Sequence, residues 1–581
     1  MKASRWKHRL RAFFGARGLP VFYDPTYRLP LASIEAATGM EPRRADLALG
    51  YLLETGVIRP TDVRTPHRIR YKDLARVHTH ELLDSLSSAE ELGRIFAVDA
   101  TDVNVDELVR TLRVACGGTL DAARAALARG GATLNLLGGF HHAGPGRGGG
   151  FCAVNDVATA VAALRAEGFD RRVGVLDLDA HPPDGLAECF EGDPSVWIGS
   201  LSGADWGALP GVDETRLPPG CDDASYLSAL GALLRRMPPA ALTFVLAGGD
   251  VLAGDRFGAF ALSLDGARRR DLRVTRALAG GPSVWLPAGG YSEDAWKVLA
   301  GTGLALALGS LEPVPPGYDA LRARFARIAA QIDPRELDGG FELTEEDVLA
   351  SLGRPSPKAL RLLDYYTKEG LEYAFSRYGL LEQLRRLGYS RFRFAISREG
   401  IGDCLRVFGR FGGAEHLLIE CVVEKRSLGE DEVLYVHWLT LRHPRGRFSD
   451  QRPKLPGQEE PGLGLARECA ELLARMAARL GLAGLAYRPA WYHTAYAGRY
   501  DLAFVEPARQ GRWEAILRDF SGVPLRAATL ALTEGRVRMN GAPYSWEADE
   551  MVHWLDGRVP ERGRIEAERA RVRFEIVSPS G

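Results

Sequence analysis

The sequence has no Cys-x-x-Cys pair, no long apolar run and almost no net charge. Its seven cysteines are odd in number, and none forms a Cys-x-x-Cys pair, which argues against a disulfide framework or a zinc ribbon. No stretch reaches the 18 or so apolar residues of a membrane span, and basic residues interrupt the N-terminal segment 1–15, so we expect no cleaved signal peptide. A net charge of -1 argues against a general nucleic-acid binder. These absences predict a cytoplasmic protein without membrane or nucleic-acid partners.

A length of 581 residues predicts at least two domains. Apolar runs that suit buried strands alternate with helical patterns through the first 300 residues, which favours an α/β fold with a parallel sheet and helices on both faces. The strand candidates are Leu19–Tyr23, Leu134–Leu137, Val173–Leu178, Val196–Ile198, Leu242–Ala247 and Val284–Ala288. The helix candidates are Ala45–Glu54, Val105–Arg129, Asn155–Glu167, Ala224–Arg236 and Asp265–Ala279.

The segment 173–185 combines an apolar run with a group of acidic residues. It ends in Asp177, Asp179, His181 and Asp184, and it contains no Lys or Arg that could make these residues a salt-bridge cluster. Because successive side chains of a strand alternate between its faces, Asp177, Asp179 and His181 should share one side, while Leu178 and Ala180 point to the other. Because buried charges are paired or coordinate metals, this pattern predicts a metal site.

Three other predicted strands also end in polar residues. His141 and His142 follow the run at 134–137, Asp250 follows the run at 242–247, and Tyr291 follows the run at 284–288. In open parallel sheets ligands bind beyond the carboxyl ends of the strands, so these side chains should converge. We interpret Asp179, His181 and Asp250 as three metal ligands that leave a position open for water, as in catalytic zinc sites.

These parts predict metal-assisted amide hydrolysis. A metal ion lowers the pKa of water toward about 7 and polarises a carbonyl. A His oriented by a carboxylate can take the water proton and return it to the leaving amine. A Tyr hydroxyl can donate to the developing oxyanion.

Five motifs, in the same order along the chain, resemble the histone deacetylase family of the arginase-deacetylase fold over about residues 18–312. The form of two of them, Arg147-Gly-Gly-Gly-Phe-Cys152 and Ala288-Gly-Gly-Tyr291, is most similar to the class IV branch. The motifs are Gly138-Gly-Phe-His-His-Ala143, Gly148-Gly-Gly-Phe-Cys-Ala-Val-Asn-Asp156, Asp177-Leu-Asp-Ala-His-Pro-Pro-Asp-Gly185, Gly249-Asp-Val-Leu-Ala-Gly-Asp-Arg-Phe-Gly258 and Gly289-Gly-Tyr291.

The resemblance implies a deacetylase or deacylase with one zinc ion held by Asp179, His181 and Asp250. It implies that His142, backed by Asp184, is the general base and acid. His141, backed by Asp177, would remain an electrostatic partner, and Tyr291 would bind the acyl oxygen. Gly150 and Phe151 would line the substrate channel. The implied substrate is an acylated lysine of a protein or a small N-acyl amine.

The resemblance also implies sites for a monovalent cation, usually potassium. The first would use Asp177, Asp179, His181, Ser200 and Leu201. The second would use Phe190, Asp193 and Val196, mostly through backbone carbonyls.

Pro182-Pro183 departs from the family pattern, which usually has His-Gly or Gln-Gly after the metal-binding His. Proline fixes φ and removes a backbone donor, so the contact between Asp184 and His142 is the part of the implied mechanism most exposed to this change.

We expect a deacetylase domain over residues 1–312, a proline-containing linker and helix over 313–335, and an α+β domain over 336–581. The linker follows from the proline-rich segment 311–317 and the helical pattern Leu321–Gln331, and a capping-box signal lies at Leu343-Thr-Glu-Glu-Asp347. Strand candidates in the second domain are Arg391–Ile396, Leu417–Glu424, Val433–Leu441, Leu485–Arg488 and Leu502–Val505, and helix candidates are Leu360–Leu387 and Leu465–Gly481.

The loop 455–466 follows a predicted strand and opens a helix, as pyrophosphate-binding loops do. It is faintly similar to the acetyl-CoA loop of GNAT acetyltransferases, but Glu459 stands where that family has Gln or Arg, and Gln458 is one place off. A cofactor-binding GNAT, a degenerate GNAT-like scaffold and an unrelated scaffold remain open.

Two alternatives to the deacylase function remain open for the whole chain. One is an inactive deacetylase-like protein that acts through its C-terminal domain as a binding module. The other is a ureohydrolase of the same fold, which would need ligands for a second metal; its usual two-metal motif is absent from the sequence.

Overall fold

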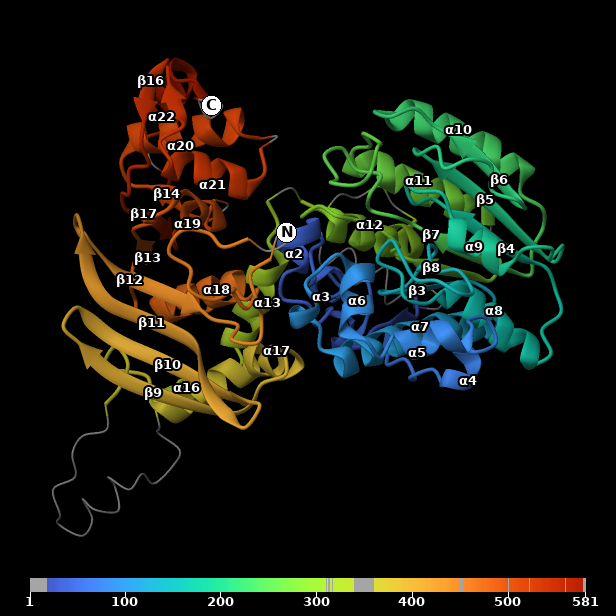
Figure 1. Ribbon diagram of the computed structural model, residues 1–581, viewed down its shortest axis with the longest axis horizontal. Helices are drawn as coiled ribbons and strands as arrows, with labels where there is room; N and C mark the ends of the chain where they lie inside the picture. The colour runs from blue at the N-terminus through green and yellow to red at the C-terminus, as the bar shows by residue number, and fades with distance from the viewer. Residues whose placement is uncertain are drawn as a thin grey trace, which may run out of the picture. The chain divides into compact units, whose positions relative to one another are not determined.

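The computed structural model describes residues 18–278, 280–309, 311, 314–315, 317–338, 360–449, 453–499, 501–521, 523–559 and 561–577 (Figure 1). The chain divides into two compact units, residues 1–320 and 321–581. The sequence places residues 321–335 in a linker and helix, whereas this division groups them with the second unit. The capping-box signal at 343–347 lies outside the described residues.

Unit 1 is built on an eight-stranded, fully parallel sheet, as the sequence predicts. The strand order is β2-β1-β3-β8-β7-β4-β5-β6. The strands are β1 Val21–Phe22, β2 Val63–Arg64, β3 Ala132–Asn135, β4 Val173–Asp177, β5 Val196–Ser202, β6 Val212–Arg216, β7 Leu242–Leu246 and β8 Ser283–Leu286. β2 and β6 were not predicted, because one is two residues long and the other reads Val-Asp-Glu-Thr-Arg without an apolar side.

Helices cover both faces of this sheet: α7 and α8 lie on one side of the strands and α10, α11 and α12 on the other (Figure 1). The helices are α2 Ile34–Thr38, α3 Arg44–Glu54, α4 Tyr71–Leu74, α5 His80–Ser85, α6 Ala89–Phe96, α7 Val105–Arg129, α8 Asp156–Ala166, α9 Asp184–Cys189, α10 Asp223–Arg236, α11 Leu264–Leu278 and α12 Ala295–Leu308. Short 3₁₀ helices lie at Pro25–Tyr27, Pro60–Asp62 and Ala100–Asp102.

The two helices beside the functional motifs begin at side-chain caps. The Asn104 side chain accepts a hydrogen bond from the Glu107 N–H at the start of α7, and Asn155 does the same for Ala158 at the start of α8. Asn is among the residues preferred at this position, because it satisfies an N–H that has no partner within the helix. Both helices were therefore predicted to within one residue.

The central strands β4, β7 and β8 are completely buried, with Val175, Phe244 and Trp285 among the fully covered side chains. Burial on both faces is the property of parallel sheets that makes their strands read as continuous apolar runs. The order β3-β8-β7-β4 therefore places four polar strand ends side by side.

Unit 2 contains a seven-stranded mixed sheet of order β14-β17-β13-β12-β11-β10-β9 and a three-stranded sheet β16-β15-β18. Its strands are β9 Ser390–Glu399, β10 Gly402–Phe411, β11 Ala414–Leu428, β12 Asp431–Leu441, β13 Gly484–Tyr487, β14 Ala503–Phe504, β15 Val537–Met539, β16 Ala542–Tyr544, β17 Met551–Trp554 and β18 Phe574–Ile576. Its helices are α13 Ala320–Ala329, which begins at the unit boundary, α14 Arg335–Asp338, α16 Lys368–Arg377, α17 Leu380–Arg386, α18 Ala466–Arg479, α19 Tyr492–Ala497, α20 Pro507–Asp519, α21 Leu525–Thr533 and α22 Arg562–Arg571. The α+β prediction for this region is confirmed.

The predicted helix Leu360–Leu387 is wrong in its extent. Residues 360–367 of the described chain are not helical, and the rest is split into α16 and α17 by Gly379, whose φ of +85° is left-handed. Glycine adopts this conformation without steric cost, so it can end one helix and start the next.

No helix among the residues described is long and apolar enough to cross a membrane. All seven cysteines are free.

Candidate active site

Strand β4 is shorter than the sequence predicts, and the reason is the site itself. Beyond Asp177 the backbone turns to carboxylates: the Asp179 N–H donates to Asp177 Oδ1 (3.1 Å), and the Ala180 N–H donates to both oxygens of Asp250 (3.1 Å each). The expected alternation of Asp177, Asp179 and His181 along one strand is therefore wrong. Asp179 and His181 lie on the loop that follows β4.

The structure nevertheless brings the three predicted metal ligands together. Nδ1 of His181 lies 3.0 Å from Asp179 Oδ1 and 3.0 Å from Asp250 Oδ2. Both carboxylates are buried, and one donor atom from each residue lies within 4.8 Å of the others. Although burial alone would lower it, the hydrogen bonds and charges of the two aspartates raise the pKa of His181 to about 11. The group strongly attracts a positive charge.

The backbone fits closely around these carboxylates. The Gly289 N–H donates to Asp179 Oδ2 (2.7 Å), and a Cβ at Gly289 would meet the same oxygen at 2.6 Å. Only glycine allows the chain after β8 to approach the ligand group this closely.

His141 and His142, on the loop after β3, face this group with rings 4.0 Å apart. Nδ1 of His141 lies 2.8 Å from Asp177 Oδ2, and Nδ1 of His142 lies 2.6 Å from Asp184 Oδ1. Pro182-Pro183 therefore does not turn Asp184 away. The Asp184 N–H donates to the Pro182 carbonyl (2.9 Å), so the two prolines form the turn that starts α9.

The two histidines have opposite proton affinities. Burial alone would lower the pKa of His141, but the charge of Asp177 raises it to about 9. Burial and the neighbouring His141 lower the pKa of His142 to about 4, although Asp184 opposes this shift. Two adjacent rings with separated pKa values can take different roles in proton transfer.

Tyr291 completes the site from the end of β8. It is buried, and its ring packs against Phe151 (centroids 5.0 Å apart) and Phe257 (4.9 Å). Burial, followed by the negative charge of Asp179, raises the pKa of Tyr291 well above its ordinary value, so the hydroxyl keeps its proton.

The predicted channel residues adopt an unusual backbone. Gly150 has φ +54° and Phe151 φ +64°, and a Cβ at Gly150 would meet His142 Cδ2 at 2.4 Å. A non-glycine residue in this region is strained, and such strain concentrates at functional sites. The Phe151 N–H donates to the Ile95 carbonyl (3.1 Å), which holds the segment in place.

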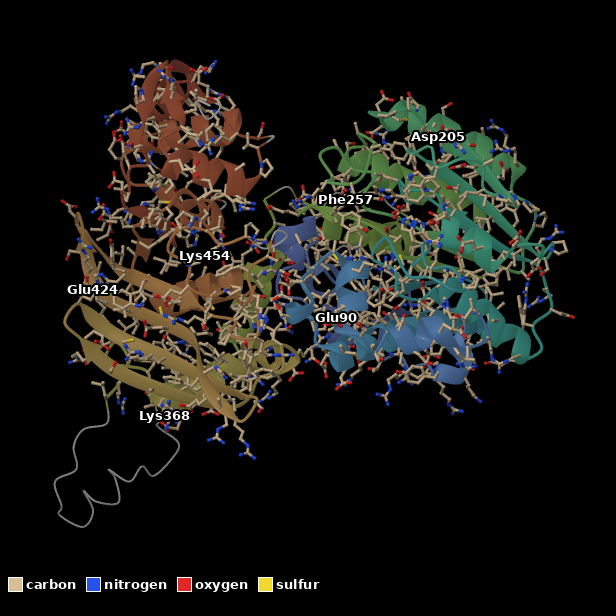
Figure 2. All side chains as sticks on the ribbon, in the orientation of Figure 1. Glu90, Asp205, Phe257, Lys368, Glu424 and Lys454 are labelled. Carbon is tan, nitrogen blue, oxygen red and sulfur yellow. The ribbon has the colours of Figure 1, made fainter. Side chains whose placement is uncertain are left out.

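Sequence reasoning missed two aromatic residues at the mouth of the site. Trp206, half exposed in the loop after β5, has its ring 5.3 Å from that of His142 and 6.0 Å from that of His181. Phe257, also exposed, packs against Phe151 (5.6 Å). Figure 2 labels Phe257 and Asp205, the neighbour of Trp206. Residues in loops show no hydrophobic periodicity that would reveal them, although Phe257 lies within the motif 249–258.

Three residues of the motifs, to which the sequence assigns no role, support the site through hydrogen bonds or ion pairs. Asp156 accepts from the N–H groups of Gly139 and Phe140, which fixes the loop before the histidines. Asp255 accepts from the Tyr291 N–H (2.7 Å). Arg147 pairs with Asp184 Oδ2 (2.8 Å). Although burial alone would raise it, His142 and Arg147 lower the pKa of Asp184 to about 2.

The residues of the expected cation sites lie around β4 and β5. Asp177 is the register partner of Ser200, whose buried Oγ has no hydrogen-bond partner in the described part of the chain. Leu201 follows in β5. Phe190 ends α9; its carbonyl accepts from the Asp193 N–H (3.0 Å), and the Asp193 carbonyl accepts from Val196 (3.3 Å). The Asp193 side chain pairs with Arg165 (2.6 Å) and also accepts from the Ser195 N–H (2.9 Å) within this turn.

Comparison with known proteins places residues 38–305 in the histone deacetylase domain family. An uncharacterized protein of Picosynechococcus is 34% identical over 295 residues, which cover 48% of this chain and 93% of that protein. Histone deacetylase 2 of Arabidopsis thaliana is 30% identical over 299 residues, covering 48% of this chain and 76% of that protein.

Among solved structures, an HDAC homolog complexed with SAHA gives a TM-score of 0.40 at 21% identity and covers 50% of this chain and 84% of that one. The acetylpolyamine aminohydrolase of Burkholderia pseudomallei gives a TM-score of 0.41 at 22% identity and covers 50% and 99%. The family assignment rests on the sequence comparisons, and with the parallel sheet it confirms the arginase-deacetylase fold for unit 1. The chain belongs to the histone deacetylase family.

Proposed function

We propose that unit 1 is a zinc-dependent deacylase that hydrolyses the amide of an acylated lysine or of a small N-acyl amine. One observation carries the proposal: the buried group Asp179, His181 and Asp250 lies against two carboxylate-backed histidines and the tyrosine Tyr291. A deacylase needs these parts together, whereas a binding module needs none of them.

The donor group fits a zinc ion. It offers one imidazole and two carboxylates, the ligand types that zinc accepts, and three protein ligands are the usual number at a catalytic zinc. The two carboxylates raise the pKa of His181 to about 11 although burial alone would lower it, and a divalent cation would take the place of the positive charge that they stabilise there. Asp179, His181 and Asp250 would hold the ion.

When bound, zinc would lower the pKa of water and polarise the acyl carbonyl. His142 is neutral near pH 7 and can therefore accept the water proton, while Asp184 at 2.6 Å holds its ring and compensates the charge that it gains. His141 keeps its proton because Asp177 stabilises the charged form, and it supplies positive charge beside the reacting carbonyl. Tyr291 keeps a hydroxyl that can donate to the oxyanion.

The aromatic residues at the mouth support a narrow channel for the substrate stem. Phe151 and Phe257 pack against Tyr291 on one side, and Trp206 lies over His142 on the other. Gly150 leaves room beside His142. Methylene chains of an acyl-lysine or of an alkyl amine would pack against such rings.

For potassium, we propose the site of Asp177, Asp179, His181, Ser200 and Leu201. The buried Ser200 Oγ supports it, because it has no hydrogen-bond partner among the residues that the structure describes, whereas most buried polar atoms have one. For the second site, at Phe190, Asp193 and Val196, we propose that the ion would be bound mostly by backbone carbonyls.

The acyl group would enter a cavity that adjoins His142, Gly150 and Tyr291. This cavity has a volume of about 40 Å³, and its lining includes the apolar side chains of Met40, Phe96, Leu137 and Phe140. A cavity needs about 10–15 Å³ of such volume to hold one water molecule, so this cavity has room for about three groups of that size. The cavity therefore suits an acetyl group and is too small for a long acyl chain.

We expect the zinc-loaded full chain to hydrolyse N-acetyl-lysine peptides or N-acetyl polyamines and to lose this activity after chelation, with recovery when zinc is restored. Because overpacking costs about 1–3 kcal/mol, kcat/KM for octanoyl substrates should be lower by about tenfold or more. A panel that varies acyl length and amine, with arginine as the control for a ureohydrolase, checks this. Release of urea, or no hydrolysis of any acyl amine, would count against the proposal.

The contact between Asp184 and His142 gives a pH test. Asp184 raises the pKa of His142, so Asp184→Asn should lower that pKa. The base acts when neutral, and the acidic limb of the pH profile of kcat/KM should therefore move to lower pH while kcat/KM at the plateau falls. Glu188→Gln is the matched control, because Glu188 pairs with Arg147 but does not contact His142. Identical profiles for Asp184→Asn and wild type would reject the contact as catalytic.

For residues 336–581 we propose a scaffold that does not bind acetyl-CoA, whether degenerate GNAT-like or unrelated. In the loop 455–466 the Gln458 side chain accepts from the Leu455 N–H (3.1 Å), and Glu459 pairs with Arg442 (3.3 Å). The glutamine is thus engaged within its own turn, and an acidic residue stands beside it, which is unfavourable for a pyrophosphate.

A further inference from the structure

A fully buried arginine bridges the two loops that carry the metal-ligand carboxylates. Nη1 of Arg270, on α11, donates to the carbonyl of Gly248 at 2.7 Å and reaches the carbonyl of Leu178 at 3.4 Å. Leu178 immediately precedes Asp179, and Gly248 lies two residues before Asp250. One guanidinium therefore contacts the backbone beyond β4 and beyond β7.

Arg270 is itself held by a buried chain of side chains. Its Nε donates to Asp271 Oδ1 (2.8 Å), and Asp271 Oδ2 accepts from the Thr302 hydroxyl on α12 (2.6 Å). All three side chains are essentially inaccessible to solvent. Burial alone would lower the pKa of Arg270, but Asp271 and then Tyr226 raise it, so the guanidinium is charged. Charge-assisted bonds in such surroundings are strong and directional.

The two carbonyls that Arg270 binds control where the ligands lie. The peptide plane between residues 178 and 179 sets the direction from which Asp179 enters the site, and the plane between 248 and 249 does the same for the turn to Asp250. The loops are also tightly packed, because a Cβ at Gly248 would meet the Asp179 Cα at 2.8 Å. The two N–H groups of Nη1 are fixed in the plane of the guanidinium and can hold two acceptors in set directions, whereas the N–H groups of an ammonium rotate on a flexible stem.

We propose that Arg270 is a positioning residue that fixes the two ligand loops and so holds the metal site in its binding geometry. The inference rests on the proposed metal site, but it concerns residues that touch neither metal nor substrate. Supports of this kind orient ligands, and their loss typically weakens metal affinity by about 10–100-fold.

The test uses the full chain loaded with Co²⁺, whose visible absorption reports the geometry of the ligands. Arg270→Met and Arg270→Lys are expected to speed release of Co²⁺ to a chelator by about 10–100-fold and to change the absorption band. Asp271→Asn, which removes the charge that orients the guanidinium, should act in the same direction. Arg268→Met is the matched control: Arg268 is buried on the same helix, and its Nη1 donates to the Leu311 carbonyl (3.0 Å) rather than to a ligand loop.

Wild-type release rates and spectra in Arg270→Met and Arg270→Lys would overturn the positioning role, as would equal effects in Arg268→Met. If Arg270→Met does not fold, Arg270→Lys and Asp271→Asn decide by the same criteria. Failure of the proposed function looks different: the wild-type chain would then bind Co²⁺ no better than its Asp179→Ala variant.

Discussion

Replacing Asp179 or His181 with alanine is expected to abolish both zinc retention and amide hydrolysis. The three donor atoms lie within 4.8 Å of one another, and two of them cannot keep the geometry of a three-ligand site. Metal analysis of the purified variants and kcat/KM on an N-acetyl-lysine substrate measure the two losses. We expect no bound zinc and activity at the background level.

The Asp179→Ala variant should also be less stable than the wild type without metal. Asp179 and Asp250 are buried carboxylates that repel each other, and burial together with Asp179 raises the pKa of Asp250 well above its ordinary value. Asp179 itself is held in its charged form: burial alone would raise its pKa, but His141 and His181 lower it well below the ordinary value. Its carboxylate also accepts from the Gly289 N–H, so metal-free Asp179→Ala should melt below the metal-free wild type. The wild type, but not the variant, should gain about 2.7 kcal/mol when zinc is present at 100 times its Kd.

Asp213→Ala serves as the control, since Asp213 lies on β6 and pairs with Arg236 on the surface of unit 1. It should leave zinc content and activity unchanged. Full activity in a zinc-ligand variant would contradict the assigned ligand set.

The site was largely predictable because a parallel sheet collects its strand ends. Buried strands read as apolar runs, and the residues after each run meet at one edge, so His142, Asp179, Asp250 and Tyr291 could be grouped from the sequence alone. The exact end of β4 could not be predicted. The strand ends because the N–H groups of Asp179 and Ala180 donate to carboxylates and not to a neighbouring strand. The acceptor of the Ala180 N–H is Asp250, which is distant in the sequence, so local sequence patterns cannot predict this end.

The burial of Arg270 could not be predicted from the hydrophobic periodicity of the sequence. The segment Ala267-Arg-Arg-Arg-Asp271 reads as an exposed basic face, yet Arg268 and Arg270 are buried and Arg269 pairs at the surface with Asp265. Long side chains can reach distant partners, so the burial of each arginine depends on acceptors elsewhere in the sequence. In unit 2, β10 was missed because Arg406 and Gly409 interrupt its apolar pattern.

Tyr291→Phe is expected to lower kcat by about a hundredfold or more, the usual effect of losing one oxyanion donor, while KM changes little and zinc stays bound. The substitution removes only a hydroxyl. The ring keeps its packing against Phe151 and Phe257, so the channel wall should persist. Because burial and Asp179 raise the pKa of Tyr291 well above its ordinary value, the hydroxyl is a donor throughout the working pH range. The loss should therefore not vary with pH near neutrality.

Steady-state kinetics of Tyr291→Phe between pH 6 and pH 9, with metal analysis of the same samples, checks this expectation. Tyr51→Phe is the matched control, since Tyr51 is buried on α3 and packs edge-to-face against Tyr318 (4.9 Å) without reaching the ligand group. Its kcat should equal that of the wild type. A fall in kcat for Tyr291→Phe alone, at constant zinc content, assigns the effect to the hydroxyl acting in the transition state. A kcat that does not fall would reduce Tyr291 to a packing residue of the channel wall and leave the oxyanion to His141.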